Sequence, residues 1–253
     1  MSRNVLVTNA AGFAGPAAVR AFIENGDSVW ALDADFSQDD NRAAFEAAHP
    51  GVVARDHMLL EGDGTEITAE LGWLDTVVSN DHYPADHGGL IGSSTDSLRQ
   101  TLEALVVQPF ARLQVLLPLL RSSPSPNVVM VNSNRSKLPV RGGCIPDAAR
   151  DAMNALMTSW AKELAPEGIV VNAVAPNYFY SEAYYPRARF VDDPQGRRFV
   201  ADTVPAGRLG NDTEMGELIL FLGTLSSRFT TGAVVDFAGG WPLAMTPETW
   251  VLD

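Results

Sequence analysis

Short apolar runs alternate with segments of helical periodicity from the first residues onward. The predicted strands are residues 5–7, 28–32, 51–54, 76–79, 128–131, 169–174 and 234–237. The predicted helices are residues 16–25, 41–48, 95–120, 147–164 and 214–222. This alternation is typical of βα units, which wind a parallel sheet with helices on both faces. The pattern therefore predicts an α/β chain with a Rossmann-like, doubly wound parallel sheet of about seven strands.

Three segments show neither period clearly. We expect irregular structure over residues 57–65, a loop over residues 80–92 and a long connection from residue 175 to about residue 204. No internal repeat and no linker of biased composition interrupts the chain, and every predicted strand is needed for one sheet. Residues 1–253 are therefore predicted to form a single domain.

Composition and charge narrow the classes of function. The 253 residues include 18 Lys+Arg against 31 Asp+Glu, a net charge of −13 that repels phosphate backbones and anionic lipids. No apolar run approaches the roughly 20 residues that span a bilayer. The lone Cys144 forms no internal disulfide, and Met1 lies three residues before a strand, with no secretory signal between them. We expect a cytoplasmic protein with neither nucleic-acid nor membrane partners.

The turn after the first strand is where a dinucleotide would bind in such a sheet. Glycines are needed there because only a residue without a Cβ lets backbone amides reach the pyrophosphate at the helix N-terminus. The turn reads Thr8-Asn9-Ala10-Ala11-Gly12-Phe13-Ala14-Gly15. Asp33, about 20 residues on, lies where an acid would bind the ribose. The benzyl side chain of Phe13 would take volume that the cofactor needs.

The whole chain resembles the short-chain dehydrogenase/reductase superfamily, whose members usually carry Thr-Gly-x-x-x-Gly-x-Gly at this turn. Asn9 and Phe13 replace the first two glycines of that pattern, and Gly15 is retained. The resemblance therefore implies a vestigial cofactor turn, formed by Thr8, Gly12, Gly15 and Asp33, and no cofactor. The alternative is that Gly12 shifts the turn by one residue and a nicotinamide dinucleotide still binds.

Within that superfamily the chain resembles most the halohydrin dehalogenases, which use no nicotinamide and keep an aromatic residue in the old cofactor pocket. Three further segments besides the turn agree with this branch. They are Val78-Ser79-Asn80-Asp81, Ala175-Pro176-Asn177-Tyr178-Phe179, and the tail from Phe237 to Pro242 with Trp250 beyond it. The resemblance implies a halide and substrate pocket formed by Phe13, Asn177, Tyr178, Phe179, Asp81, His82 and Trp250.

The chemistry that the resemblance implies is the closure of a vicinal haloalcohol to an epoxide plus halide, and the reverse opening of epoxides by small anions. In that family a Ser holds the substrate oxygen, a Tyr thirteen residues later removes its proton, and an Arg four residues after the Tyr keeps the phenol acidic. The corresponding residues here are Ser133, Pro146 and Arg150. Ser133 and Arg150 are therefore expected to be catalytic, whereas the base is missing because proline has no titratable group.

Several residues could replace the missing base. Asp147 lies three residues from Arg150, and an ion pair between them would make it a poor base for an alcohol. Asp81 and His82 are expected at the carboxyl edge of the sheet, where such folds bind ligands, and Tyr83 or Tyr180 could reach in from loops. The loop histidines His82 and His87 could also be metal ligands, but no Cys or third His supports a metal site.

Three functions follow from these residues. The first is a halohydrin dehalogenase-like lyase whose base comes from another residue. The second is a ligand-binding homologue without turnover, and the third is an NAD(P)-dependent oxidoreductase. The apolar helices 95–120 and 147–164 carry more apolar surface than one sheet face covers, which indicates a homotetramer or homodimer.

Overall fold

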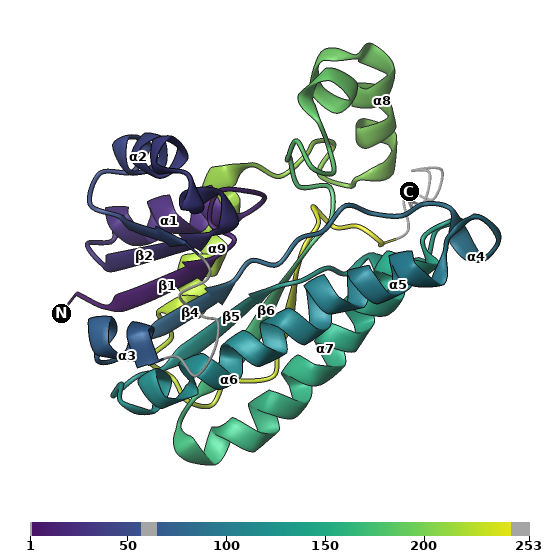
Figure 1. The fold of residues 1–253 in the computed structure, drawn as a ribbon. Coiled ribbons are helices and arrows are strands. Elements are labelled where there is room, and N and C mark those ends of the chain that lie inside the picture. Colours follow the sequence, from purple (N-terminus) through teal and green to yellow (C-terminus); the bar gives the residue numbers. More distant parts are fainter. Residues whose placement is uncertain (1, 57–64, 244–253) are drawn as a thin grey trace, which may run out of the picture.

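The computed structural model describes residues 2–56 and 65–243. The strands are β1 Asn4–Thr8, β2 Ser28–Asp33, β3 Val53–Asp56, β4 Thr76–Ser79, β5 Asn127–Val131, β6 Val170–Pro176 and β7 Val234–Phe237. They form one parallel sheet in the order β3-β2-β1-β4-β5-β6-β7. The prediction of a Rossmann-like, doubly wound sheet of about seven strands is confirmed (Figure 1).

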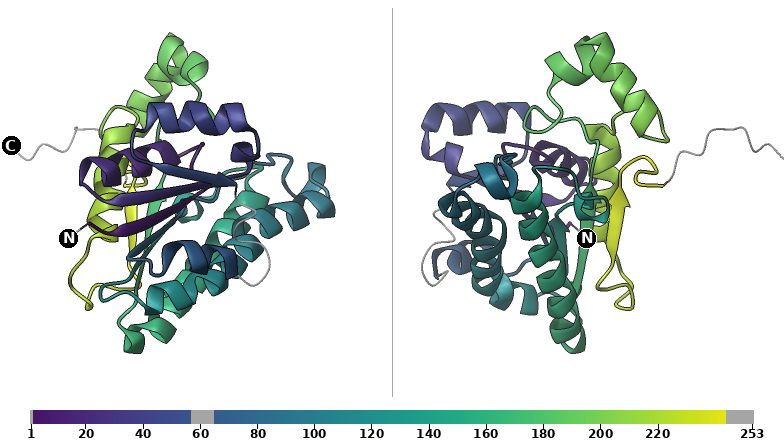
Figure 2. Two further views of the ribbon diagram at one scale, coloured as in Figure 1. Left: turned by 60° about the vertical axis from the view of Figure 1, so that its left-hand side comes forward. Right: turned by 90° about the vertical axis from the view of Figure 1, so that its right-hand side faces the viewer.

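Helices cover both faces of this sheet. They are α1 Gly15–Glu24, α2 Asp39–Ala48, α3 Thr65–Leu71, α4 Gly89–Gly92, α5 Thr95–Leu102, α6 Gln108–Arg121, α7 Cys144–Leu164, α8 Pro194–Thr203 and α9 Asp212–Gly223. The first layer contains α1, α2 and α9, the second contains α3, α6 and α7, and α8 stands apart from both (Figures 1 and 2).

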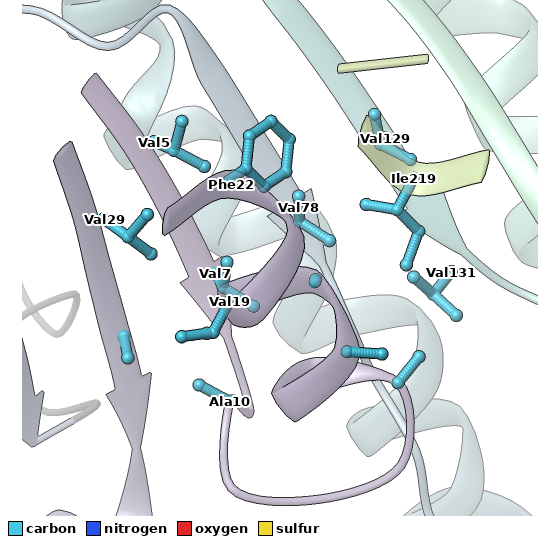
Figure 3. Packing of buried hydrophobic residues seen from close by; sticks show 14 of the residues in the cluster. Val5, Val7, Ala10, Val19, Phe22, Val29, Val78, Val129, Val131 and Ile219 are labelled. Atoms are coloured by element: carbon cyan, nitrogen blue, oxygen red, sulfur yellow. The ribbon is translucent and has the colours of Figure 1, made fainter. Parts of the chain in front are cut away.

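The core lies on both sides of the sheet because successive strand residues point to opposite faces. Val5 and Val7 of β1 pack with Phe22 of α1 and Ile219 of α9, as Figure 3 shows. Leu6, between the two valines, packs on the other face with the apolar residues of α6 and α7. The strands therefore consist of continuous apolar residues, which is why they could be recognised from the sequence.

The helix predicted over residues 95–120 is not continuous. A π-helical turn, Glu103–Val107, separates α5 from α6, and Pro109, the second residue of α6, has no N–H with which to continue the α-helical bonding. The combined stretch Thr95–Arg121 has 27 residues and is long and apolar enough to cross a membrane by composition alone, a test that core helices also pass. Only 28% of an apolar 18-residue part of this stretch is buried, and the side chains of Val107 and Phe110 are exposed.

Three helices formed where none was predicted. α4 lies in the predicted loop 80–92, α3 begins at the end of the irregular stretch, and α8 lies in the long connection after β6. α8 has a recognisable start, because the side chain of Asp193 accepts from the N–H of Gln195 and Pro194 occupies the first helical position. α7 begins at Cys144, three residues before its predicted start, which places Pro146 in its first turn.

Candidate functional site

The turn between β1 and α1 has a backbone conformation typical of glycine at two positions that are not glycine. Asn9 and Phe13 have φ angles of 47° and 51°, in the left-handed region that glycine adopts at little steric cost. These are two of the three positions at which the superfamily pattern has glycine, and the third is Gly15. Gly12 is not among the positive-φ residues, so the left-handed positions of this turn are Asn9 and Phe13 and not Gly12.

Packing inside the turn explains the two glycines that remain. A Cβ on Gly15 would lie 2.5 Å from the carbonyl oxygen of Ala10, and one on Gly12 would lie 2.9 Å from the imidazole ring of His82. Neither approach is sterically possible without movement of the neighbour. Gly15 is therefore required by the backbone of the turn, with or without a phosphate ligand, whereas a side chain at Gly12 would require the His82 ring to move.

Backbone amides of the turn are occupied by side chains of this chain. The N–H of Ala11 donates to a carboxylate oxygen of Asp33 at 2.9 Å, and the N–H of Ala14 donates to Oδ1 of Asn80 at 3.3 Å. These two amides are therefore engaged within the protein and are not free to bind a phosphate. The predicted vestigial role of Asp33 is thus a structural one, because it holds the turn.

Asn80 and Thr8 fix the same turn from β4 and β1. The Nδ2 of Asn80 donates to the carbonyl oxygens of Asn9 and Gly12 at 2.8 and 2.9 Å. The N–H of Asn80 donates to the Thr8 hydroxyl oxygen at 3.2 Å. With these bonds in place, and with Phe13 in the region of the cofactor, the turn does not fit a nicotinamide dinucleotide.

Phe13 is the centre of an aromatic cluster. Its ring centroid lies 5.3 Å from that of Tyr184 and 5.6 Å from that of Phe179, both in edge-to-face geometry, and 6.0 Å from that of His82. Such contacts stabilise aromatic pairs beyond the effect of burial. The cluster closes one wall of a cavity at the carboxyl edge of the sheet.

The cavity has a volume of about 600 Å³ and is bounded by the ends of several strands. Phe13 follows β1, Ser133 follows β5 and Asn177 follows β6. The loops after parallel strands meet at one edge, which is where open α/β sheets bind ligands. α7 contributes Pro146 and Arg150 to the same lining. The structure therefore brings together Phe13, Ser133, Arg150, Asn177, Tyr178 and Phe179, six of the predicted site residues.

Ser133 offers its hydroxyl to the cavity. The hydroxyl donates to the carbonyl oxygen of Pro176 at 3.3 Å and accepts from the N–H of Arg135 at 3.2 Å. Both distances are at or beyond the upper end of the usual range. A ligand oxygen can therefore compete for this hydroxyl, as a residue that holds the substrate oxygen requires.

Arg150 is held by neutral groups. Its Nη1 donates to the carbonyl oxygen of Asp81 at 3.0 Å and to Oδ1 of Asn132 at 3.4 Å. Nδ2 of Asn132 in turn donates to the carbonyl oxygen of Arg150 at 2.8 Å. Arg150 as a whole is 6% exposed and belongs to the cavity lining.

Asp147 does not pair with Arg150 as expected from their spacing. Its carboxylate accepts a short hydrogen bond from Nε of Arg135, which reaches it from the segment after β5. Helical spacing brings residues three apart within reach, but the arginine from the loop occupies this carboxylate. Asp147 is therefore engaged in an ion pair and is not among the residues that line the cavity.

Asn177 presents an amide donor to the cavity. Its Oδ1 accepts from the Tyr185 hydroxyl at 2.7 Å and from the N–H of Tyr178 at 3.0 Å. These two donors fix the orientation of the amide, so Nδ2 is the group left for a ligand. Tyr178 itself has a φ of 51°, a left-handed conformation that turns the chain away from β6 at this point.

Tyr185 was not predicted as a site residue but lines the cavity. Burial raises the pKa of its phenol above the usual range, and the neighbouring Tyr178 raises it further. Burial also raises the pKa of the Tyr178 phenol. Both phenols are therefore protonated at neutral pH, which makes them donors and poor bases. The hydroxyl of Tyr184, a third cavity residue, donates to the carbonyl oxygen of Tyr83 at 2.9 Å.

Asp81 and His82 lie at the predicted edge of the sheet, and neither is among the residues that line the cavity. The Asp81 carboxylate is 5% exposed and pairs with Arg112 at 2.9 Å. The His82 ring packs against Gly12 and Phe13, and its Nδ1 is buried with no hydrogen-bond partner in the described residues. Both side chains contact the turn after β1: the Asp81 carboxylate accepts from Nδ2 of Asn9, and the His82 ring packs on Gly12 and Phe13.

The other base candidates are placed as follows. Tyr83 lines the cavity, whereas Tyr180 donates to Glu182 at 2.7 Å on the surface and is not part of the lining. Trp250 lies outside the described residues. In residues 2–56 and 65–243 no group of three His, Cys, Asp or Glu side chains could hold a metal ion.

Comparisons with known proteins find a matching family model, similar solved structures that are described as dehalogenases, and sequence relatives that are dehydrogenases. Residues 7–242 match the family model described as enoyl-(acyl carrier protein) reductase. A solved structure described as a dehalogenation enzyme superposes with a TM-score of 0.88 at 32% identity, covering 95% of this chain and 98% of that one. A halohydrin dehalogenase bound to ethyl (2S)-oxiran-2-ylacetate also gives 0.88, at 29% identity over 96% of this chain and 98% of that one. An L-fucose dehydrogenase of Oryctolagus cuniculus is 27% identical, covering 97% of this chain and 87% of the relative.

Proposed function

The chain belongs to the short-chain dehydrogenase/reductase superfamily, and we propose that within it the chain is a halohydrin dehalogenase-like lyase that works without a nicotinamide. The observation that carries this proposal is the Phe13 cluster, which lies at the turn where the superfamily carries a glycine and forms a wall of the cavity. Similarity to the two dehalogenase structures supports it as well.

The proposed reaction uses groups that line the same cavity after the neighbouring strands β5 and β6. The Ser133 hydroxyl holds the oxygen of a vicinal haloalcohol, the alcohol loses its proton, and its oxygen forms a bond to the adjacent carbon. The carbon–halogen bond breaks, and halide leaves with the electron pair towards Nδ2 of Asn177 and the ring edges of Phe13 and Phe179. In the reverse direction a small anion attacks the epoxide and the oxygen regains a proton.

Proton removal is the weak step of this reaction. Pro146 has no acidic group, Asp147 is paired with Arg135, and Tyr185 and Tyr178 have pKa values raised by burial. A positioned base contributes about 10²–10⁴-fold to rate. We therefore propose that the proton leaves to water and that the wild-type reaction is slow.

Halide release from small haloalcohols tests the lyase directly. We expect slow chloride or bromide release from substrates such as 1,3-dichloropropan-2-ol, and a rate at least about tenfold lower in Ser133→Ala because a donor to the reacting oxygen is lost. Ser136→Ala, which removes an exposed hydroxyl bonded to Asp151, is the matched control and should keep the wild-type rate. An absence of halide release across a haloalcohol panel would reject the lyase in favour of a ligand-binding homologue.

The sequence relatives favour a second candidate, an NAD(P)-dependent oxidoreductase, because the L-fucose dehydrogenase is an oxidoreductase. The occupied amides of Ala11 and Ala14 argue against it. We expect titration calorimetry with NAD⁺, NADH, NADP⁺ and NADPH to give no heat of binding at millimolar nucleotide. Saturable binding of any of the four would contradict the lyase proposal and support the oxidoreductase.

We also propose a homodimer or homotetramer in the cytoplasm, built from the apolar faces of α5–α6 and α7. Phe110 of α6 and Trp160 of α7 lie together, with ring centroids 5.8 Å apart, and Phe110 is 37% exposed. Haloalcohols or epoxides and halide would be its small-molecule partners.

A further inference from the structure

The floor of the cavity contains a buried cation without an acidic partner. Arg150 as a whole is 6% exposed, and the acceptors of its Nη1 are a carbonyl oxygen and an amide oxygen. Within the described residues no carboxylate lies at ion-pair distance from it, and its Nε and Nη2 donate to no protein acceptor. The nitrogens of Arg150 are not among the buried side-chain atoms without a partner, so its unbonded N–H groups open onto the cavity and can donate to a ligand.

The neighbouring charges are already compensated. The Asp81 carboxylate pairs with Arg112 at 2.9 Å, and the Asp147 carboxylate pairs with Arg135. The other charged side chains of the lining are Arg135, Arg189 and Asp193. A chain with a net charge of −13 thus keeps an uncompensated positive charge inside its cavity.

Pro146 leaves Arg150 without a protein hydroxyl to act on. The two residues are four apart in α7 and therefore lie one turn apart on the same face, and both belong to the lining. The proline side chain has neither a donor nor an acceptor. Position 146 therefore supplies no oxygen to Arg150, which leaves room beside the guanidinium for an oxygen of a ligand.

We infer that this cavity binds small 2-hydroxy acids, with the carboxylate on Arg150 and the hydroxyl on Ser133. A carboxylate accepts two hydrogen bonds from one guanidinium, which matches the free Nε and Nη2. If the protein is the proposed lyase, this inference specifies its substrates as 3-halo-2-hydroxy acids in preference to neutral haloalcohols, and that part of it rests on the proposed function. As a statement about binding, it is independent of turnover.

A pair of unreactive ligands tests the binding. Lactate and propane-1,2-diol share a three-carbon skeleton and a hydroxyl at C2, and they differ in the carboxylate. In halide-free buffer, calorimetry of the wild-type protein should show lactate bound about tenfold to a hundredfold more tightly, the range of a charge-assisted hydrogen bond. Equal affinities, or no binding of lactate at millimolar concentration, would overturn the inference.

Two variants locate the carboxylate. Arg150→Gln should remove the preference for lactate, and Arg150→Lys should keep part of it because the charge remains. Arg189→Gln is the matched control, since Arg189 lies over the Phe190 ring in the cavity lining and forms no ion pair in the described part of the chain. A lactate preference that survives in folded Arg150→Gln and is lost in Arg189→Gln would assign binding to the rim and overturn the inference. If Arg150→Gln does not fold, Arg150→Lys is compared with the wild-type protein. A smaller preference for lactate in Arg150→Lys supports the inference, and an unchanged preference overturns it.

Failure of this inference and failure of the lyase give different results. Lactate binding without halide release from any haloalcohol would keep the 2-hydroxy acid site and reject the lyase. Halide release from neutral haloalcohols without lactate binding would keep the lyase and reject the site. Faster halide release from 3-chloro-2-hydroxypropanoate than from 3-chloropropane-1,2-diol, with Arg150→Lys narrowing the difference, is the result expected when both are correct.

Discussion

Pro146→Tyr is expected to raise the rate of halide release from neutral haloalcohols by about 100-fold or more. The new phenol would stand one helical turn from Arg150, whose positive charge lowers the pKa of a neighbouring acid. It would also line the same cavity as Ser133. A positioned general base contributes about 10²–10⁴-fold, and the wild-type cavity has no side chain in that role. The measurement is initial-rate halide release at neutral pH.

Pro146→Phe is the matched control for this gain. It adds the same ring without the hydroxyl, so it reproduces any effect of filling the cavity or of changing the first turn of α7. The backbone should accept either residue, because an N–H in the first helical turn needs no intrahelical acceptor. An unchanged rate in folded Pro146→Tyr, or an equal gain in Pro146→Phe, would show that the missing base does not limit this protein.

The sheet and the altered turn could be predicted because their causes are local. The central strands β1, β4, β5 and β6 are buried on both faces by the neighbouring helices, so their residues form nearly continuous apolar runs, as Val5, Leu6 and Val7 do. Phe13 could be recognised because a turn that needs glycine carries a bulky residue, and its φ of 51° shows that the backbone requirement persisted. Both features follow from a few consecutive residues.

The far wall of the cavity could not be predicted in the same way. Tyr184 and Tyr185 lie in a segment without apolar periodicity. Tyr184 contacts Phe13, which is far away in the sequence, and Tyr185 donates to Asn177 within the same irregular connection after β6. The partner of Asp147 was missed for the same reason. Helical spacing favoured Arg150, whereas Arg135 reaches the carboxylate through a turn that only the folded chain defines.

The ion pair between Arg112 and Asp81 ties the second helical layer to the first turn. Asp81 is 5% exposed and Arg112 is 14% exposed, with 2.9 Å between Nη1 and Oδ1. The same carboxylate accepts from Nδ2 of Asn9 at 2.8 Å and from the Ser79 hydroxyl. Asn9 has a positive φ, so the carboxylate also holds a residue in a conformation that it adopts at a steric cost.

Arg112→Met is therefore expected to lower the free energy of unfolding by about 3–5 kcal/mol, the usual cost of leaving one charge of a buried pair uncompensated. Methionine keeps much of the aliphatic volume, so the loss reports the charge and not a cavity. Arg99→Met is the matched control on α5, because Arg99 and Asp96 are 73% and 79% exposed and such pairs contribute about 0.5 kcal/mol or less. Urea unfolding at pH 7 measures both variants. Losses of equal size would mean that Asp81 is stabilised by Asn9 and Ser79 alone, and that the first turn does not depend on the helix beneath it.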